Sequence, residues 1–220
     1  MSFPETLAFP TPGSGTEPPG PNSFHLCLRP RGGSTPKEWP TTHVPGPSFC
    51  LVASLPRKRF LATWTWNGRI STWTQQHPAN SPSTRRAPIA YDGATGTVVL
   101  FSGVSGDNGA IAIDAATWVW NGANWLHLSP LTAPAPRAMA SMAYDASLHK
   151  VVLFGGTSFV NFDDTWTWDG TTWTLSPTTG PGDRFAAGLA YDPVAPGEVL
   201  FGGAGNFGAQ NDTWVFAMTP

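Results

Sequence analysis

A chain of 220 residues can form one domain of moderate size or one larger all-β domain. Only 12% of the residues are charged while 12% are aromatic, and 24 glycines with 23 prolines leave little sequence for the long helices of a bundle. The net charge of −2 gives no electrostatic reason to expect a nucleic acid or an anionic membrane as partner. No apolar run reaches the roughly 18 residues of a membrane span, and the N-terminus lacks a signal-peptide pattern.

Residues 1–60 differ in composition from the rest of the chain. They hold 12 of the 23 prolines and both cysteines, but no Tyr and no Asp. Since they also lack a sustained apolar period, we expect a Pro/Gly-rich segment that is irregular or partly disordered. The apolar run at 49–53 is the exception and favours a buried strand. These residues also lack the repeat pattern that begins at residue 61, and this suggests the hypothesis that part of the segment is read out of frame.

From residue 61 onward, three sequence markers recur. Ala-Tyr-Asp ends at Asp92, Asp145 and Asp192, and each copy is followed by an apolar tract: VVLF, VVLFGG or EVLFGG. A Thr-Trp pair occurs four times, beginning at residues 63, 117, 165 and 213. The spacing stays between 47 and 54 residues for every marker. Such a period predicts one supersecondary unit that is copied along the chain.

Alternating Thr and Trp in the segment TWTWDGTTWT, residues 165–174, predict a strand with two different faces. Asp-Gly in this segment, and Asn-Gly in two other copies, favour a tight hairpin turn. With these dipeptides as two-residue loops, Trp166 faces Trp173 and Trp118 faces Trp125. In the first copy a four-residue loop at 67–70 pairs Trp64 with Trp73. A third ring lies two residues along the strand in each copy, at Trp66, Trp120 and Trp168.

Ten of the eleven tryptophans lie in these repeats. Each ring buries roughly 150–250 Å², so together they remove on the order of 2,000 Å² from water. A lone hairpin cannot bury such a face, so we expect each unit to stack on its neighbours. The tracts before Tyr144 and Tyr191 are rich in Ala, Gly and Met, which suits a crowded inner strand. Four strands per unit, repeated radially, predict an all-β fold of the β-propeller class.

The markers together resemble the kelch repeat: an Arg-led first strand that ends in Tyr-Asp, a double glycine after the second strand, and then Asp-Thr-Trp. The pattern is similar to the bacterial, Trp- and Thr-rich repeats that resemble the galactose oxidase central domain. The resemblance covers residues 61–220, and its first full copy departs, with Ser102-Gly103 and Ala116-Thr117 at two marker positions. It implies a kelch-type propeller of about three to three and a half four-stranded blades: a half blade at 61–76 and blades at 85–128, 137–176 and 184–218.

A partial propeller of this size admits three interpretations. The sequence belongs to a truncated gene product, or the chain associates with itself or another chain to close the ring, or residues 1–60 fill the gap. A degenerate blade that uses the run at 49–53 would be part of the third interpretation. The family resemblance suggests an extracellular location, although no signal peptide is present.

Galactose oxidase-like enzymes hold copper with Tyr and His, and this chemistry does not transfer residue by residue. Tyr91, Tyr144 and Tyr191 share one repeat position, which indicates packing, and the histidines share none. The cysteines, at 27 and 50, have no metal-ligand spacing. We therefore predict no catalytic residue, no cofactor and no metal site.

Two sets of charged residues at repeat positions have more than one interpretation. Arg86, Arg137 and Arg184, at the starts of the inner strands, would either form an anion-binding ring or pair with local Asp and carbonyl groups. The Asp residues after the three tyrosines favour turn chemistry. The tryptophans are interpreted as core, although stacking on sugar rings is the alternative.

Long loops between the second and third strands, at 103–115, 157–163 and 204–211, are where we expect a ligand. Their candidate residues are Asp107, Asn108, Phe159, Asn161, Asn206, Phe207 and Gln210. The leading interpretation is a non-enzymatic scaffold that binds protein or carbohydrate through these loops. The alternatives are a propeller domain of a secreted galactose oxidase-like or carbohydrate-active enzyme, and a truncated product without activity.

Overall fold

The computed structural model describes the backbone of residues 47–52 and the whole of residues 62–84, 86–105, 112–177, 180–195 and 197–216. In these ranges every regular element is a β-strand, so the predicted all-β class is confirmed. The remaining residues, which include most of the predicted irregular segment 1–60 and the candidates Asp107 and Asn108, lie outside the described parts.

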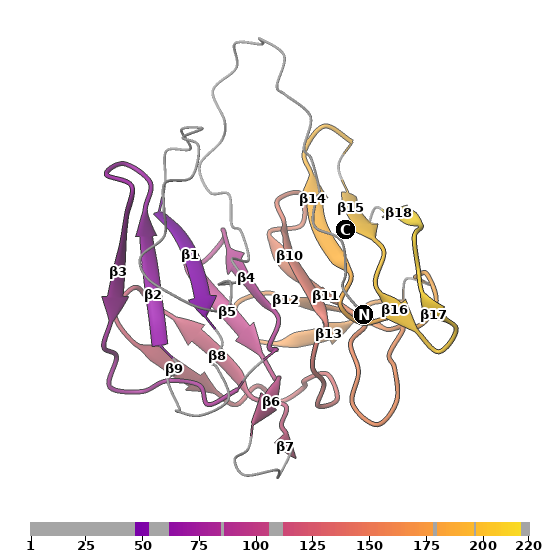
Figure 1. Ribbon diagram of the computed structural model, residues 1–220, viewed down its shortest axis with the longest axis horizontal. Helices are drawn as coiled ribbons and strands as arrows, with labels where there is room; N and C mark the ends of the chain where they lie inside the picture. The colour runs from indigo at the N-terminus through magenta and orange to yellow at the C-terminus, as the bar shows by residue number, and fades with distance from the viewer. Residues whose placement is uncertain are drawn as a thin grey trace, which may run out of the picture.

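Four antiparallel sheets follow one another in chain order, from the indigo sheet on the left of Figure 1 to the yellow sheet on the right. We call them sheets I to IV. Sheet I consists of β1 (Pro47–Val52), β2 (Ala62–Asn67) and β3 (Thr72–Gln76). Sheet II consists of β4 (Ile89–Asp92), β5 (Thr97–Phe101), β8 (Thr117–Trp120) and β9 (Trp125–Leu128).

Sheet III has the same four-stranded order, and sheet IV has three strands among the described residues. Sheet III consists of β10 (Ser141–Asp145), β11 (Lys150–Phe154), β12 (Thr165–Trp168) and β13 (Trp173–Leu175). Sheet IV consists of β14 (Gly188–Asp192), β15 (Gly197–Phe201) and β18 (Thr213–Phe216). Two small hairpins lie in the loops after the second strands of sheets II and IV: β6 (Val104–Ser105) with β7 (Ala112–Ile113), and β16 (Ala204–Gly205) with β17 (Gly208–Ala209).

The predicted register of the tryptophan hairpins is wrong by two residues. Trp168 faces Trp173, and Trp120 faces Trp125. In sheet I the partner of Trp73 is Trp66 rather than Trp64. A shift of two residues keeps every side chain on its predicted face. The tryptophan pairs therefore exist, but they use the ring nearer the turn, with centroids 5.1, 5.6 and 5.3 Å apart in sheets I, II and III.

The turn chemistry explains this shift. Asp169 N–H donates to the carbonyl of Thr172, so the two-residue loop is Gly170-Thr171 and not Asp169-Gly170. Asp169 Oδ1 accepts the N–H groups of Thr171 and Thr172, which places the Asp at the last strand position before the loop. Only the glycine has positive φ, at 95°, as in a hairpin turn that needs Gly at its first position alone. Asn121 does the same for Ala123 and Asn124.

The core lies between neighbouring sheets. Trp168 and Trp173 of sheet III pack against Val99, Phe101 and Val119 of sheet II, and all five are buried. The rings of Phe101 and Trp173 have centroids 5.1 Å apart. The expected stacking of units through their tryptophan faces is therefore present between sheets II and III.

Hydrogen bonds at equivalent repeat positions join successive sheets. At the outer strands, the indole N–H of Trp125 donates to Thr63 Oγ1 at 2.9 Å, and that of Trp173 donates to Thr117 Oγ1 at 3.0 Å. At the inner strands, Met139 N–H donates to the carbonyl of Arg86 at 2.9 Å. The same kind of inner bond is formed one unit later, with Ala186 as donor and Met139 as acceptor at 2.8 Å.

The double glycine is required by two close approaches, one from the next unit at Gly155 and one from the segment before the inner strand of its own sheet at Gly156. Gly155 and Gly156 have φ of 65° and 102°. A Cβ on Gly155 would lie 2.3 Å from the carbonyl oxygen of Arg184, and one on Gly156 would lie 2.9 Å from the Cβ of Ala140. Positive φ and the close approach of neighbouring atoms therefore both favour glycine at these two positions.

Candidate functional site: the loops after the second strands

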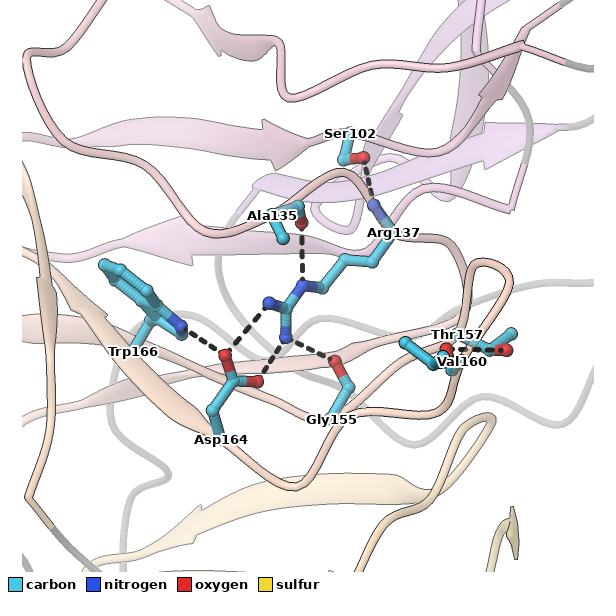
Figure 2. Close-up of polar contacts among 8 residues, drawn as sticks. All are labelled: Ser102, Ala135, Arg137, Gly155, Thr157, Val160, Asp164 and Trp166. Carbon is cyan, nitrogen blue, oxygen red and sulfur yellow. Dashed lines mark hydrogen bonds and ion pairs between the residues drawn. The ribbon is translucent and has the colours of Figure 1, made fainter. Parts of the chain in front are cut away.

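The loop at 155–164 is fixed at its base by a buried arginine, shown in Figure 2. Arg137 is fully buried, and its guanidinium binds both carboxylate oxygens of Asp164, at 2.5 and 3.0 Å. It also donates to the carbonyls of Ala135 and Gly155 at 2.9 and 3.0 Å. The guanidinium carbon lies 3.8 Å from the centroid of the Phe162 ring. The Arg137 side chain therefore contacts the first residue of the loop, its last residue and the ring of Phe162 within it.

The same anchor recurs in sheet IV. Arg184 binds Asp212 at 2.7 and 3.2 Å and donates to the carbonyl of Gly202 at 3.2 Å. The indole N–H of Trp214 also donates a hydrogen bond to the Asp212 carboxylate, at 2.6 Å, and that of Trp166 donates to Asp164 at 2.7 Å. Hydrogen bonds from arginine and indole hold the pKa of Asp212 well below its usual range. Burial opposes the same effect at Asp164, but the two hydrogen bonds still lower its pKa.

Arg137 and Arg184 thus pair locally, as one of the two interpretations of the arginines stated. Arg86 does not belong with them. Its positive φ of 55° matches 55° at Met139 and at Ala186, so Arg86 is their counterpart in sheet II. Its side chain is exposed, and the buried Thr84 stands where the other two units have arginine. Ala116 stands where they have Asp, so both members of the ion pair are replaced together.

Hydrogen bonding brings two of the predicted loop candidates together. Asn161 Nδ2 donates to Asn206 Oδ1 at 3.0 Å, which joins the loops of sheets III and IV. Phe159 and Phe207 point into solvent, with 101% and 94% of their surface exposed. The backbone N–H of Gln210 donates to the carbonyl of Gly203 inside its own loop.

Sequence reasoning missed Val160, which is 61% exposed beside Phe159. The three exposed apolar side chains, Phe159, Val160 and Phe207, are called the loop-tip patch below. The nearly constant separation of Arg and Asp along the chain, 27 residues in one unit and 28 in the next, is the signal that could have located the loop anchors from the sequence.

Two of the three tyrosines at the shared repeat position, Tyr91 and Tyr144, pack against buried core residues, as predicted. Tyr144 lies against the preceding sheet, where a Cβ on Gly93 would come within 2.6 Å of its ring. Burial, with the negative charges of Asp92 and Asp145, raises the pKa of Tyr144. The Asp residues after the tyrosines cap their turns, since Asp92 Oδ1 accepts the N–H groups of Ala94 and Thr95. Turn chemistry is therefore their observed role.

Two further findings concern the described ranges as a whole. They contain no group of three or more His, Cys, Asp or Glu placed to hold a metal ion. No helix long and apolar enough to span a membrane occurs in them either.

Glu198 is an unforeseen buried carboxyl between sheets III and IV. It stands where the two preceding units have Val98 and Val151, and it is fully buried with no hydrogen-bond partner at either oxygen. Burial, and then the charge of Asp145, raise its pKa to about 8. Asp145 Oδ2 is also buried and unpartnered, because Leu148 replaces the Thr95 whose hydroxyl bonds Asp92 in the preceding unit.

No protein-family model and no curated protein matches this chain. Among solved structures, 108 chains match it. One of them, "Structure of YjhT", aligns with a TM-score of 0.57 at 15% sequence identity, over 71% of this chain and 49% of that chain. The likeness shows the fold alone. This chain is an all-β, propeller-like fold that spans about half the length of the structure it matches.

Proposed function

We propose that this chain is a non-enzymatic scaffold of the kelch type, a partial propeller of about three to three and a half blades, which binds a partner through its loop-tip patch. The carrying observation is that Phe159 and Phe207 are fully exposed on loops with rigid bases. Each base is held by a buried arginine that pairs with a partly exposed aspartate, and the Asn161–Asn206 hydrogen bond joins the two loops. Exposed apolar side chains on rigid loops are typical of interaction sites.

The apolar character of the patch favours a polypeptide over a carbohydrate as the partner. Phenylalanine and valine provide hydrophobic contact area but no hydrogen-bonding group for sugar hydroxyls. Asn161 and Asn206 are chain neighbours of Val160 and Phe207, and their amides already bond each other. A glycan remains the second class of ligand for the same loops, since an aromatic ring can stack on a sugar.

Selection from a displayed peptide library, beside a panel of immobilised oligosaccharides, tests this proposal with defined probes. We expect enriched peptides to bind the chain and to lose at least tenfold in affinity when Phe159 and Phe207 are both changed to Ser. The matched control is Leu131→Ser, which removes an equally exposed apolar side chain elsewhere, at 104% exposure. Enriched ligands that bind the double variant and the wild type equally would refute the proposal, and so would the absence of any enrichment.

A further inference from the structure

In the described parts of the chain, the first and the last sheet of the series, I and IV, each have one face that no other sheet covers. The contact between sheets II and III shows what normally covers such a face. Sheet II presents Phe101 and Thr117, and sheet III covers them with Trp168 and Trp173. Trp173 serves both residues, because its ring packs on Phe101 at 5.1 Å and its N–H bonds Thr117. We call these two surfaces the Phe-Thr face and the Trp face.

Sheet IV carries an uncovered Phe-Thr face. Phe201 and Thr213 are paired across β15 and β18, as Phe101 and Thr117 are across β5 and β8. Phe201 is 59% exposed, whereas Phe101 is fully buried. Val215, on the same face, is 63% exposed, whereas its counterpart Val119 is 9% exposed. The opposite face of sheet IV is the one turned toward sheet III, since Phe216 contacts Phe154 there.

Sheet I carries an uncovered Trp face. Thr63 accepts the indole N–H of Trp125 from sheet II, so the threonine side of β2 is turned toward sheet II. Side chains alternate along a strand, and Trp64 and Trp66 therefore lie on the other side, away from sheet II. Trp73 pairs with Trp66 on this side and is 39% exposed, whereas its counterparts Trp125 and Trp173 are buried.

The two uncovered faces are therefore the two halves of the contact that the chain already makes inside itself. We propose that a second copy of this chain docks its sheet I Trp face on the sheet IV Phe-Thr face, with Trp73 packing on Phe201 and donating its indole N–H to Thr213. The occupant is a second copy because the internal contacts of the chain show that the two surfaces fit. This inference is independent of the loop-tip patch.

A contact of this kind is head to tail, since each copy contributes a different surface. Such an interface closes into a ring when the geometry allows it and otherwise continues as an open chain of copies. In either case the exposed indole and phenyl rings become buried, and a sheet face with a large apolar area ceases to be an aggregation hazard.

Complementation between two variants provides the test. Phe201→Asp removes the Phe-Thr face but keeps the Trp face, and Trp73→Asp does the reverse. We expect the wild-type chain to assemble in sedimentation velocity or light scattering, and each variant alone to have the mass of one copy. An equimolar mixture of the two should form a species of two copies, because one intact face of each kind remains. A contact that pairs each face with the same face of the other copy cannot give this result.

Two further variants keep the test independent of folding defects. Thr213→Arg places a large charge on the Phe-Thr face at an exposed position and should also give single copies. Phe159→Asp is the control: it makes the same Phe-to-Asp change at an exposed loop position, and the variant should assemble like the wild type. A wild-type chain that stays a single copy over the full soluble concentration range overturns the proposal. Assembly that survives Phe201→Asp and Thr213→Arg, or a mixture that fails to pair, also overturns it.

Discussion

Two equivalent threonines, Thr117 and Thr165, provide a direct measure of the bond between successive sheets. Both are buried, at 0% and 1% exposure, and both begin the third strand of a four-stranded sheet. Thr117 Oγ1 accepts the indole N–H of Trp173. Thr165 Oγ1 has no hydrogen-bond partner in the structure. Changing each threonine to Val replaces only the hydroxyl, with a methyl group of similar volume.

The expected effects have different sizes and signs. Thr117→Val leaves the N–H of Trp173, itself 1% exposed, without an acceptor, which costs about 1–3 kcal/mol of the free energy of unfolding. Thr165→Val removes a hydroxyl that was already unpaired, so the change should be near zero or stabilising by up to about 1 kcal/mol. The thermal midpoint should move by roughly 2–4 °C per kcal/mol in a domain of this size.

Urea unfolding followed by tryptophan fluorescence, at one fixed protein concentration, measures both variants. The slope with denaturant must stay constant for the midpoints to report stability alone. If both variants lose the same free energy within about 0.5 kcal/mol, the assignment of the indole bond to Thr117 and of the vacant acceptor to Thr165 is wrong.

Three further predictions concern other buried groups. Glu198→Val should flatten the pH dependence of stability. In the wild type, folding raises the pKa of the Glu198 carboxyl from 4.5 to about 8. This carboxyl therefore makes its full contribution to stability below pH 4.5 and loses it as the pH rises to about 8. Measured by urea unfolding, the stability of the variant relative to the wild type should be higher above pH 8 than below pH 4.5 by about 4–5 kcal/mol. The control substitution Asp163→Asn, at an exposed position, should change the free energy of unfolding little. Asp164→Asn leaves the buried Arg137 with an uncharged partner and should cost about 3–5 kcal/mol and raise amide exchange in the loop 155–164; no change in exchange would contradict the anchor role. Gly156→Ala should cost more than Gly122→Ala by calorimetry, because φ is positive at both but a Cβ meets neighbouring atoms at 2.9–3.1 Å only at Gly156.

The class and order of the elements could be predicted from the sequence because the repeat markers are short-range patterns. Alternation of Thr and Trp defines strand faces, and the double glycine marks the end of the second strand, so β5, β11 and β15 lie where the apolar tracts predicted them. The register of the hairpins could not be predicted in the same way. Asp-Gly is compatible with two loop positions, and the choice depends on whether the Asp side chain caps the turn.

The site was predictable only by location. Loops after the second strands could be found from their length and composition, but the exposure of Phe159 and Phe207 depends on the fold around them. Arg86 was wrongly grouped with Arg137 and Arg184. Two consecutive arginines in the first full unit conceal that Thr84 occupies the position aligned with the other two. Glu198 was missed because a single polar residue in an apolar tract carries no signal until its neighbours are known.

Hydrogen exchange of the indole N–H groups, followed by nitrogen-edited NMR, tests the stacking of successive sheets most directly. We expect the signals of Trp125 and Trp173, each assigned by a Trp→Phe variant, to be strongly protected, since both groups are buried and bonded to a threonine of the neighbouring sheet. If these two indoles exchange as fast as free tryptophan in the folded chain, the sheets do not stack in this way.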